Sequence, residues 1–173
     1  MIIIDVQTTD KRGELDDASR IGNGLHVKYD SNSVLQNQAD VVGLARDLKL
    51  PIFNVTASAS GNTQTVAALQ KNFPRDREGV HDFNKSDNNV LGDLDAHRQP
   101  KFLKLLEQQL GKVSPIFLVV MGFNANQCVQ GSVFGNRGQA DYENLYGKHK
   151  GYPKTKGLLE YGYTIMTCRN VLA

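Results

Sequence analysis

Three things are scarce in this sequence: cysteine, long apolar runs and net charge. Its 173 residues contain two cysteines, Cys128 and Cys168, and two scattered thiols are more often reduced than paired, so we expect no disulfide. No apolar run approaches the roughly 20 residues of a membrane-spanning helix. A net charge of +2 is too small to indicate nucleic acid or a membrane as partner. Met1 leads directly into a core-type strand with no visible secretory signal, so the expected compartment is cytoplasmic.

Metal-binding and phosphate-binding motifs are also missing. The four histidines are isolated and lack ligand spacing: His26, His81, His97 and His149. The GNG sequence at Gly22–Gly24 lacks the further glycine and the lysine of a phosphate-binding loop. We therefore predict no metal and no cofactor.

What the chain does contain is a repeated alternation of strand and helix patterns. Apolar, often β-branched runs predict strands at residues 2–6, 52–56, 80–84, 116–121 and 163–168. Helical patterns cover residues 33–48 and 63–71, run from Pro100 to Gly111, and follow Cys128. The length suits one domain over residues 1–173. The alternation predicts an α/β three-layer sandwich, in which helices cover both faces of a mainly parallel central sheet of about five or six strands.

Two reactive side chains follow buried strands of this expected sheet. Asp5 comes directly after Ile2–Ile4, and Cys128 comes after an Asn-rich turn, where a helix is expected to begin. Parallel sheets bind ligands beyond the carboxyl ends of their strands, so a carboxylate and a thiol could meet there as base and nucleophile. The helix N-terminus should favour the thiolate, which predicts that Cys128 is the more reactive thiol. Cys168 lies in an apolar run and is expected to pack in the core.

The sequences MIIIDVQ and VVMGFNANQCV carry a family resemblance. In this order and separation they resemble the isochorismatase-like cysteine hydrolases, which have a hydrophobic strand ending in Asp-x-Gln and a later strand followed by a Gly-containing turn and a cysteine. The resemblance covers the order of elements from Met1 to about Val133 and again Gly162 to Ala173. Residues 134–160 show no family pattern, and we interpret about 135–157 as an atypical insertion.

The resemblance implies a catalytic triad of Asp5, Lys85 and Cys128. Asp5 would accept the thiol proton, Lys85 would hold the carboxylate, and Cys128 would attack a carbonyl and form a thioester. The lysine is the open position, because Lys101 and Lys104 also precede the cysteine. Lys85 follows the weak strand HDFN, which is where the family motif places its lysine. The family's usual aromatic and small residues after the lysine are absent here, which leaves Lys101 and Lys104 as alternatives.

The resemblance also implies the surroundings of the thiol. The backbone N–H groups of Asn124 and Cys128 would form the oxyanion hole, with a cis peptide bond between Phe123 and Asn124. Gln7 and Phe123 would contact the substrate, although a turn hydrogen bond explains Gln7 equally well.

The expected reaction follows from which family members the chain does not resemble. Nicotinamidases hold a divalent ion through an Asp-x-His pattern and a further His after the second strand, but here that region reads NVTASASGNT. Isochorismatase proper usually lacks the nucleophilic cysteine. The resemblance therefore implies a cysteine hydrolase that cleaves the amide or carbamoyl C–N bond of a small metabolite. The alternative is a catalytically silent member of the fold that serves as a binding or assembly module.

The insertion bears on partners, because basic and aromatic residues alternate in it, among them Arg137, Lys148, Tyr142 and Tyr146. Such a mixture can bind single-stranded nucleic acid, but a solvated loop, an active-site flap or an oligomer contact explains it more simply. We expect a small-molecule substrate and no nucleic acid. An exposed edge strand promotes association, so we also expect a homo-oligomer.

Overall fold

Strands and helices alternate along the chain as predicted. The computed structural model describes residues 1–6, 31–57, 65–87, 89–111, 115–122, 128–135 and 155–172. The strands are β1 (Ile2–Ile4), β2 (Ile52–Ala57), β3 (Val80–Lys85), β4 (Phe117–Gly122) and β5 (Thr164–Met166). The α-helices are α1 (Ser31–Asp47), α2 (Ala67–Gln70), α3 (Lys101–Leu110) and α4 (Gln130–Phe134), and the 3-10 helices are η4 (Leu158–Tyr161) and η5 (Arg169–Val171). Within these ranges, no helix is long and apolar enough to cross a membrane.

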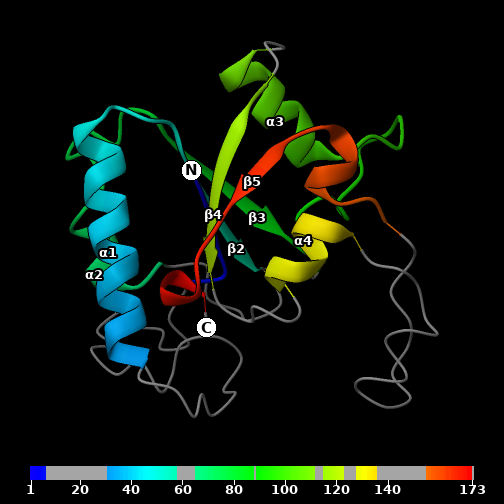
Figure 1. The fold of residues 1–173 in the computed structure, drawn as a ribbon. Coiled ribbons are helices and arrows are strands. Elements are labelled where there is room, and N and C mark those ends of the chain that lie inside the picture. The colour runs from blue at the N-terminus through cyan, green and yellow to red at the C-terminus, as the bar shows by residue number, and fades with distance from the viewer. Residues whose placement is uncertain are drawn as a thin grey trace.

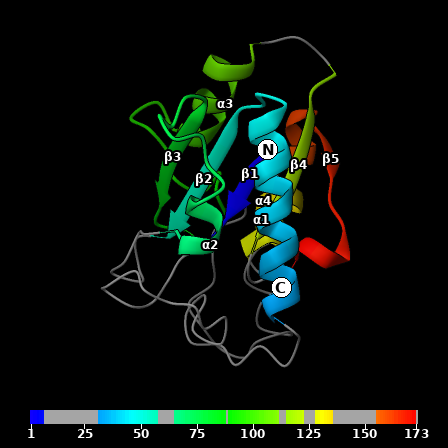
Figure 2. The same cartoon turned by 90° about the vertical axis from the view of Figure 1, so that its left-hand side faces the viewer.

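The strands form one parallel sheet in the order β3-β2-β1-β4-β5 (Figure 2). The middle strand, β1, pairs with β2 through Ile2–Phe53 and with β4 through Ile2–Val120. Every residue of β1 is buried, because both faces of the middle strand are covered. This double burial explains why the sequence of β1 is continuously apolar rather than alternating.

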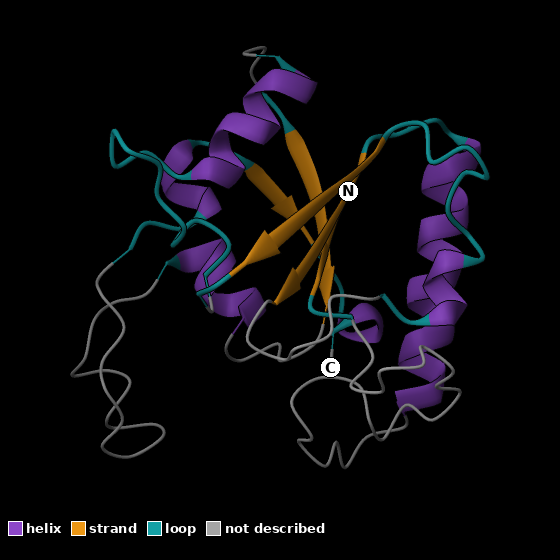
Figure 3. Cartoon of the chain, turned by 180° about the vertical axis from the view of Figure 1, so that it is seen from behind, coloured by secondary structure: helices purple, strands orange, loops and turns teal. Residues whose placement is uncertain are grey.

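Helices cover both faces of the sheet. In Figure 1 α1 and α2 lie on one side of the strands, and α3 and α4 lie on the other. Seen from behind, the strands form a single layer between the two groups of helices (Figure 3). The predicted three-layer α/β sandwich with a parallel central sheet is therefore confirmed.

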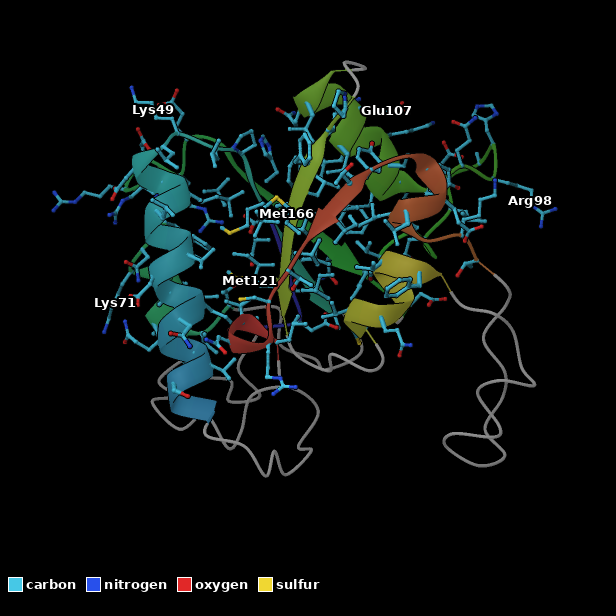
Figure 4. All side chains as sticks on the ribbon, viewed as in Figure 1. Lys49, Lys71, Arg98, Glu107, Met121 and Met166 are labelled. Atoms are coloured by element: carbon cyan, nitrogen blue, oxygen red, sulfur yellow. The ribbon has the colours of Figure 1, made fainter. Side chains whose placement is uncertain are left out.

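Two apolar clusters fill the two interfaces between helices and sheet. One packs α1 against the sheet and includes Leu35, Val42 and Met121. The other packs α3 and α4 against the opposite face and includes Phe53 and Phe102. Figure 4 shows Met121 between α1 and the strands, whereas the labelled charged side chains project from the periphery: Lys49, Lys71, Arg98 and Glu107.

The predicted ends are confirmed for helix α3 but not for helix α2. Pro100 precedes α3 and Gly111 ends it with a φ of 72°, a left-handed value that suits glycine, as the sequence predicts. The α2 helix is shorter than the predicted 63–71, because Thr65 and Val66 are not helical. Val66 instead donates its backbone N–H to the carbonyl of Val6, 3.2 Å away, and this bond fixes the chain beside β1.

The predicted role of Cys168 in the core is wrong. The fifth strand stops at Met166, and Cys168 is exposed in the turn before η5. Met166 itself is 53% exposed (Figure 4). The apolar run misled the prediction because β5 is an edge strand, and helix α1 lies over the middle of the sheet rather than over this edge (Figure 2).

Gly135 and Gly157 bring two distant parts of the chain together. A Cβ atom on Gly157 would lie 2.3 Å from the backbone nitrogen of Gly135, and one on Gly135 would lie 2.3 Å from the carbonyl oxygen of Thr155. Only glycine permits backbones to approach this closely. The backbone at Gly135 therefore lies directly beside the backbone at Thr155 and Gly157. The predicted insertion at 135–157 lies between them, and most of it, residues 136–154, falls outside the described residues.

Candidate active site

The strand order identifies where a ligand site is expected. From β1 the chain proceeds outward to β2 and β3 on one side, and then returns to place β4 and β5 on the other side. Sheets of this kind bind ligands at the reversal, beyond the carboxyl ends of the two central strands. Asp5 directly follows β1, and Cys128 follows β4 after the undescribed residues 123–127.

Asp5 occupies an unusual backbone conformation. Its φ is 56°, in the left-handed region that aspartate tolerates better than most residues. The Asp5 backbone N–H donates to the carbonyl of Val55, 2.9 Å away, so the end of β1 stays tied to β2. The residue is only 5% exposed. A buried carboxylate on a strained strand end is typical of sites where function, rather than folding, selects the residue.

Lys85 is the lysine that pairs with Asp5. Its Nζ lies 2.9 Å from Asp5 Oδ2, and the two side chains are 1% and 7% exposed. Lys85 ends β3, and two strand spacings, roughly 9.6 Å, separate β3 from β1. Only a long side chain can bridge that distance. Of the two alternatives, Lys101 is exposed and Lys104 pairs with Asp95 instead.

The two carboxylate oxygens of Asp5 have different surroundings. Oδ2 accepts the bond from Lys85, whereas Oδ1 is buried and accepts no hydrogen bond from any side chain or backbone group that the structure describes. A buried acceptor without a donor is costly.

The Cys128 thiol lies beside this ion pair and interacts with both of its members. It is 5% exposed, and its pKa is raised from 9.0 to about 12, first by burial and then by the negative charge of Asp5. The positive charge of Lys85 lowers the same pKa. Hydrogen bonding with Asp5 raises the pKa of the thiol further, whereas hydrogen bonding with Lys85 lowers it. Asp5, Lys85 and Cys128 therefore lie together, and at neutral pH the thiol is protonated.

The prediction that the surroundings of Cys128 favour its thiolate form is therefore wrong. It relied on the positive end of a helix, but α4 has only five residues, and Cys128 lies in the π-helical turn that precedes it. Burial and the Asp5 charge outweigh the opposing charge of Lys85. The expected advantage of Cys128 in access is also wrong, because Cys168 is exposed and Cys128 is buried, and the predicted order of reactivity is therefore reversed.

The sequence gives no indication of a second group of buried polar residues behind the three. Asp87 accepts a bond from Lys85 Nζ at its carbonyl oxygen, 2.9 Å away, and its Oδ1 accepts the backbone N–H of Asn89. Asn89 and Ser132 are both fully buried. The Ser132 hydroxyl connects this turn to the backbone of Cys128. The bond between Val90 and Ser132 joins residues 42 positions apart, so no local pattern reveals it.

Three predicted site residues lie outside the described residues. They are Gln7, Phe123 and Asn124. The oxyanion hole and the cis peptide bond therefore remain predictions. Among the described residues, no group of three histidine, cysteine, aspartate or glutamate side chains could share a metal ion, and the absence of a metal also stays a prediction.

The solved structures that resemble this one include the following two. MAR1 ribonuclease from Caenorhabditis elegans superimposes with a TM-score of 0.58 at 16% sequence identity, and an isochorismatase from Pseudomonas putida KT2440 with a TM-score of 0.57 at 19% identity. The chain has an isochorismatase-like fold. Both matches cover 99% of this isochorismatase-like chain, which spans 62% and 69% of the two neighbours. No family model matches the chain, and no curated protein matches its sequence.

Proposed function

We propose that the protein is a cysteine hydrolase that cleaves the amide or carbamoyl C–N bond of a small metabolite. The buried ion pair of Asp5 and Lys85 beside the Cys128 thiol is the observation that supports this proposal. An ion pair that only held the fold together would have no need of a thiol beside it. Perturbed groups that converge at a strand-end site are typical of nucleophilic catalysis.

The first half of the reaction uses Asp5 as general base. Asp5 takes the proton from the Cys128 thiol as the sulfur attacks the carbonyl carbon, and the C–S bond forms while the carbonyl oxygen becomes an oxyanion. The tetrahedral intermediate then expels the amine, which leaves with the proton that Asp5 carried. Carbonyl carbon and sulfur remain joined as a thioester.

The second half restores the enzyme. Water attacks the thioester carbon, Asp5 accepts a proton from that water, and the C–S bond breaks to release the acid. The proton returns to the sulfur, so Cys128 is again a neutral thiol. Lys85 keeps Asp5 oriented between these steps, because its ammonium lies 2.9 Å from Oδ2.

A protonated resting thiol fits this scheme. With its pKa near 12, Cys128 is neutral at physiological pH and becomes nucleophilic only as Asp5 removes its proton. A base positioned beside the thiol accelerates such a step because the proton moves as the bond forms. The resting thiol is also protected from oxidation, which acts on thiolates.

The remaining expectations follow from the same proposal. A site at the carboxyl ends of strands suits a small-molecule substrate, and we expect no nucleic acid. We expect a homo-oligomer, because β5 is an edge strand on which Met166 is 53% exposed. The expected cytoplasmic location rests on the sequence alone.

A screen of small amides and carbamoyl compounds tests the proposal through ammonia release. Cys128→Ala and Asp5→Asn should each abolish turnover, whereas Cys168→Ala, which changes the exposed thiol, should retain it. Mass spectrometry of the quenched reaction should show an acyl adduct on the Cys128 peptide. Undiminished turnover in Cys128→Ala would exclude the cysteine mechanism. No turnover by the native protein, with no adduct on any amide, would favour the alternative of a silent binding or assembly module.

A further inference from the structure

The Ser132 hydroxyl makes two buried hydrogen bonds to different parts of the candidate site. It donates to the carbonyl oxygen of Cys128, 2.6 Å away, and it accepts the backbone N–H of Val90 at 3.0 Å. The first bond alone would be unremarkable, since serines often bond to the carbonyl four residues back in their own helix. The second bond joins the turn of Cys128 to a segment 42 residues earlier.

That earlier segment is the turn that holds Lys85. Two side chains shape the described residues of this turn, 86–87 and 89–91: Asp87 Oδ1 accepts the N–H of Asn89, and Asn89 Oδ1 accepts the N–H of Leu91. In this shape the carbonyl of Asp87 points at Lys85 Nζ, 2.9 Å away. The turn therefore fixes the ammonium as well as presenting the Val90 N–H.

The turn is also anchored from its other side. Asn89 Nδ2 donates to the hydroxyl of Thr155 at 2.8 Å and to the carbonyl of Lys156 at 3.0 Å. All the hydrogen-bonding groups of the Asn89 side chain are thus occupied by fixed partners. Because buried polar networks with every member bonded are rigid, the turn has little freedom to shift.

We propose that Ser132 is a positioning residue for Cys128: its hydroxyl fastens the cysteine backbone to the turn that holds Lys85. Lys85 is bonded to the turn through Asp87, and Cys128 is bonded to it through Ser132 and Val90. The sulfur and the ion pair of Asp5 and Lys85 are thereby set at one fixed separation. In the proposed reaction, on which this inference rests, that separation determines how readily Asp5 takes the thiol proton.

Thiol labelling tests the position of Cys128 without any substrate. Full-length variants in a Cys168→Ser background are treated with iodoacetamide at pH 8, and the labelled Cys128 peptide is quantified over time. Ser132→Ala should raise the Cys128 labelling rate at least about tenfold, because a cysteine released from its place gains both access and thiolate. The groups that face the thiol among the described residues, Asp5 and Lys85, are unchanged in this variant.

Global destabilisation must be separated from local release. Asn54→Ala is the matched control, because Asn54 is also buried and makes two side-chain hydrogen bonds, to Asp82 and Thr65, away from α4. Variants are compared in urea at concentrations that give equal free energies of unfolding. Faster labelling in Ser132→Ala than in Asn54→Ala supports the proposal, and equal rates overturn it.

A second pair of variants tests the same connection from the turn that contains Asp87. These variants can replace Ser132→Ala if that variant does not fold. Asp87→Ala removes the acceptor that shapes the turn, whereas Asp87→Asn retains an oxygen acceptor. Cys128 should label faster in Asp87→Ala and should recover most of its slow labelling in Asp87→Asn. Slow labelling in both variants would show that the turn does not hold Cys128, and would overturn the proposal.

Measurement of kcat and KM adds a test in which a general loss of stability would not produce the expected result. If the native protein hydrolyses an amide, Ser132→Ala should lower kcat about 100-fold, the effect of roughly 1 Å of misplacement, while KM changes less than threefold. An unchanged kcat would overturn the positioning role and leave the hydrolase intact. If the native protein hydrolyses nothing, but labelling still separates Ser132→Ala from Asn54→Ala, the proposed function fails and the positioning role stands.

Discussion

Lys85 and Asp5 meet across an intervening strand. The ammonium of Lys85, at the end of β3, lies 2.9 Å from the carboxylate of Asp5, at the end of β1, and β2 runs between them. Both side chains are almost fully buried. Each charge is therefore tolerable only because the other is present.

Removing Lys85 should strongly destabilise the fold. Lys85→Met leaves the Asp5 carboxylate buried without its counter-charge, which costs about 3–5 kcal/mol. Lys104→Met is the control, because it removes a lysine whose partnership with Asp95 is partly exposed, and it should cost far less. Urea denaturation measures both. Adding Asp5→Asn to Lys85→Met should restore part of the loss, and a double variant less stable than Lys85→Met would contradict the explanation.

Two glycines should respond in opposite directions to alanine. A Cβ on Gly122 would lie 2.3 Å from the carbonyl oxygen of Ile4, so Gly122→Ala must push β4 away from β1 and should destabilise by about 1–3 kcal/mol. A Cβ on Gly43, inside α1, meets its first neighbour at 3.5 Å, so Gly43→Ala should stabilise by roughly 0.5–1 kcal/mol. Thermal unfolding followed by circular dichroism measures both changes. Equal effects would mean that β1 and β4 are not this close.

The two cysteines should react in the order of their exposure. Cys168 is exposed, whereas Cys128 is buried and has a raised pKa, so iodoacetamide at neutral pH should modify Cys168 first. Mass spectrometry of the two peptides from the folded native protein gives the order directly. Labelling in the presence of denaturant provides the control, since both thiols should then react at similar rates. Faster reaction of Cys128 in the folded protein would indicate a thiolate and contradict its burial.

The raised pKa of Cys128 also predicts how stability depends on alkaline pH. The Cys128 thiol has a pKa near 9.0 in the unfolded protein and about 12 in the folded protein. The stabilisation that its neutral form provides to the fold is therefore complete below pH 9 and is lost as the pH rises towards 12. Each pH unit in that window should lower the free energy of unfolding by roughly 1.4 kcal/mol. Cys128→Ala should lack this slope, while other groups contribute equally to both proteins. Parallel stability curves from pH 9 to 11 would show that the thiol is not buried.

The sequence predicted those parts of the fold and site that depend on local pattern. Continuous apolar runs identified β1 and β4 because strands buried on both faces have no polar positions, and the strand ends then indicated Asp5 and Cys128. Lys85 was harder to assign, since nothing local distinguishes a lysine that crosses β2 from a solvated one. The resemblance, not the periodicity, favoured it.

The failures have a common physical origin. An apolar run does not reveal whether a helix covers it, so Cys168 at the sheet edge was assigned to the core. A helix start does not reveal burial, so the sign of the Cys128 pKa shift was missed. The bonds of Ser132 and Asn89 join residues 42 and 66 positions apart, and such bonds exist only once the chain has folded.

The contact between Gly135 and Gly157 has a consequence for how this protein can change. Because the chain departs and returns at one point, the length of what lies between is nearly decoupled from the rest of the fold: each doubling costs only about 0.6 kcal/mol of closure entropy. The contact between the two glycines is thus a junction at which one connecting segment can replace another. Segments of different length and composition can be exchanged there by recombination or by design, while the strands and the buried ion pair of Asp5 and Lys85 keep their places.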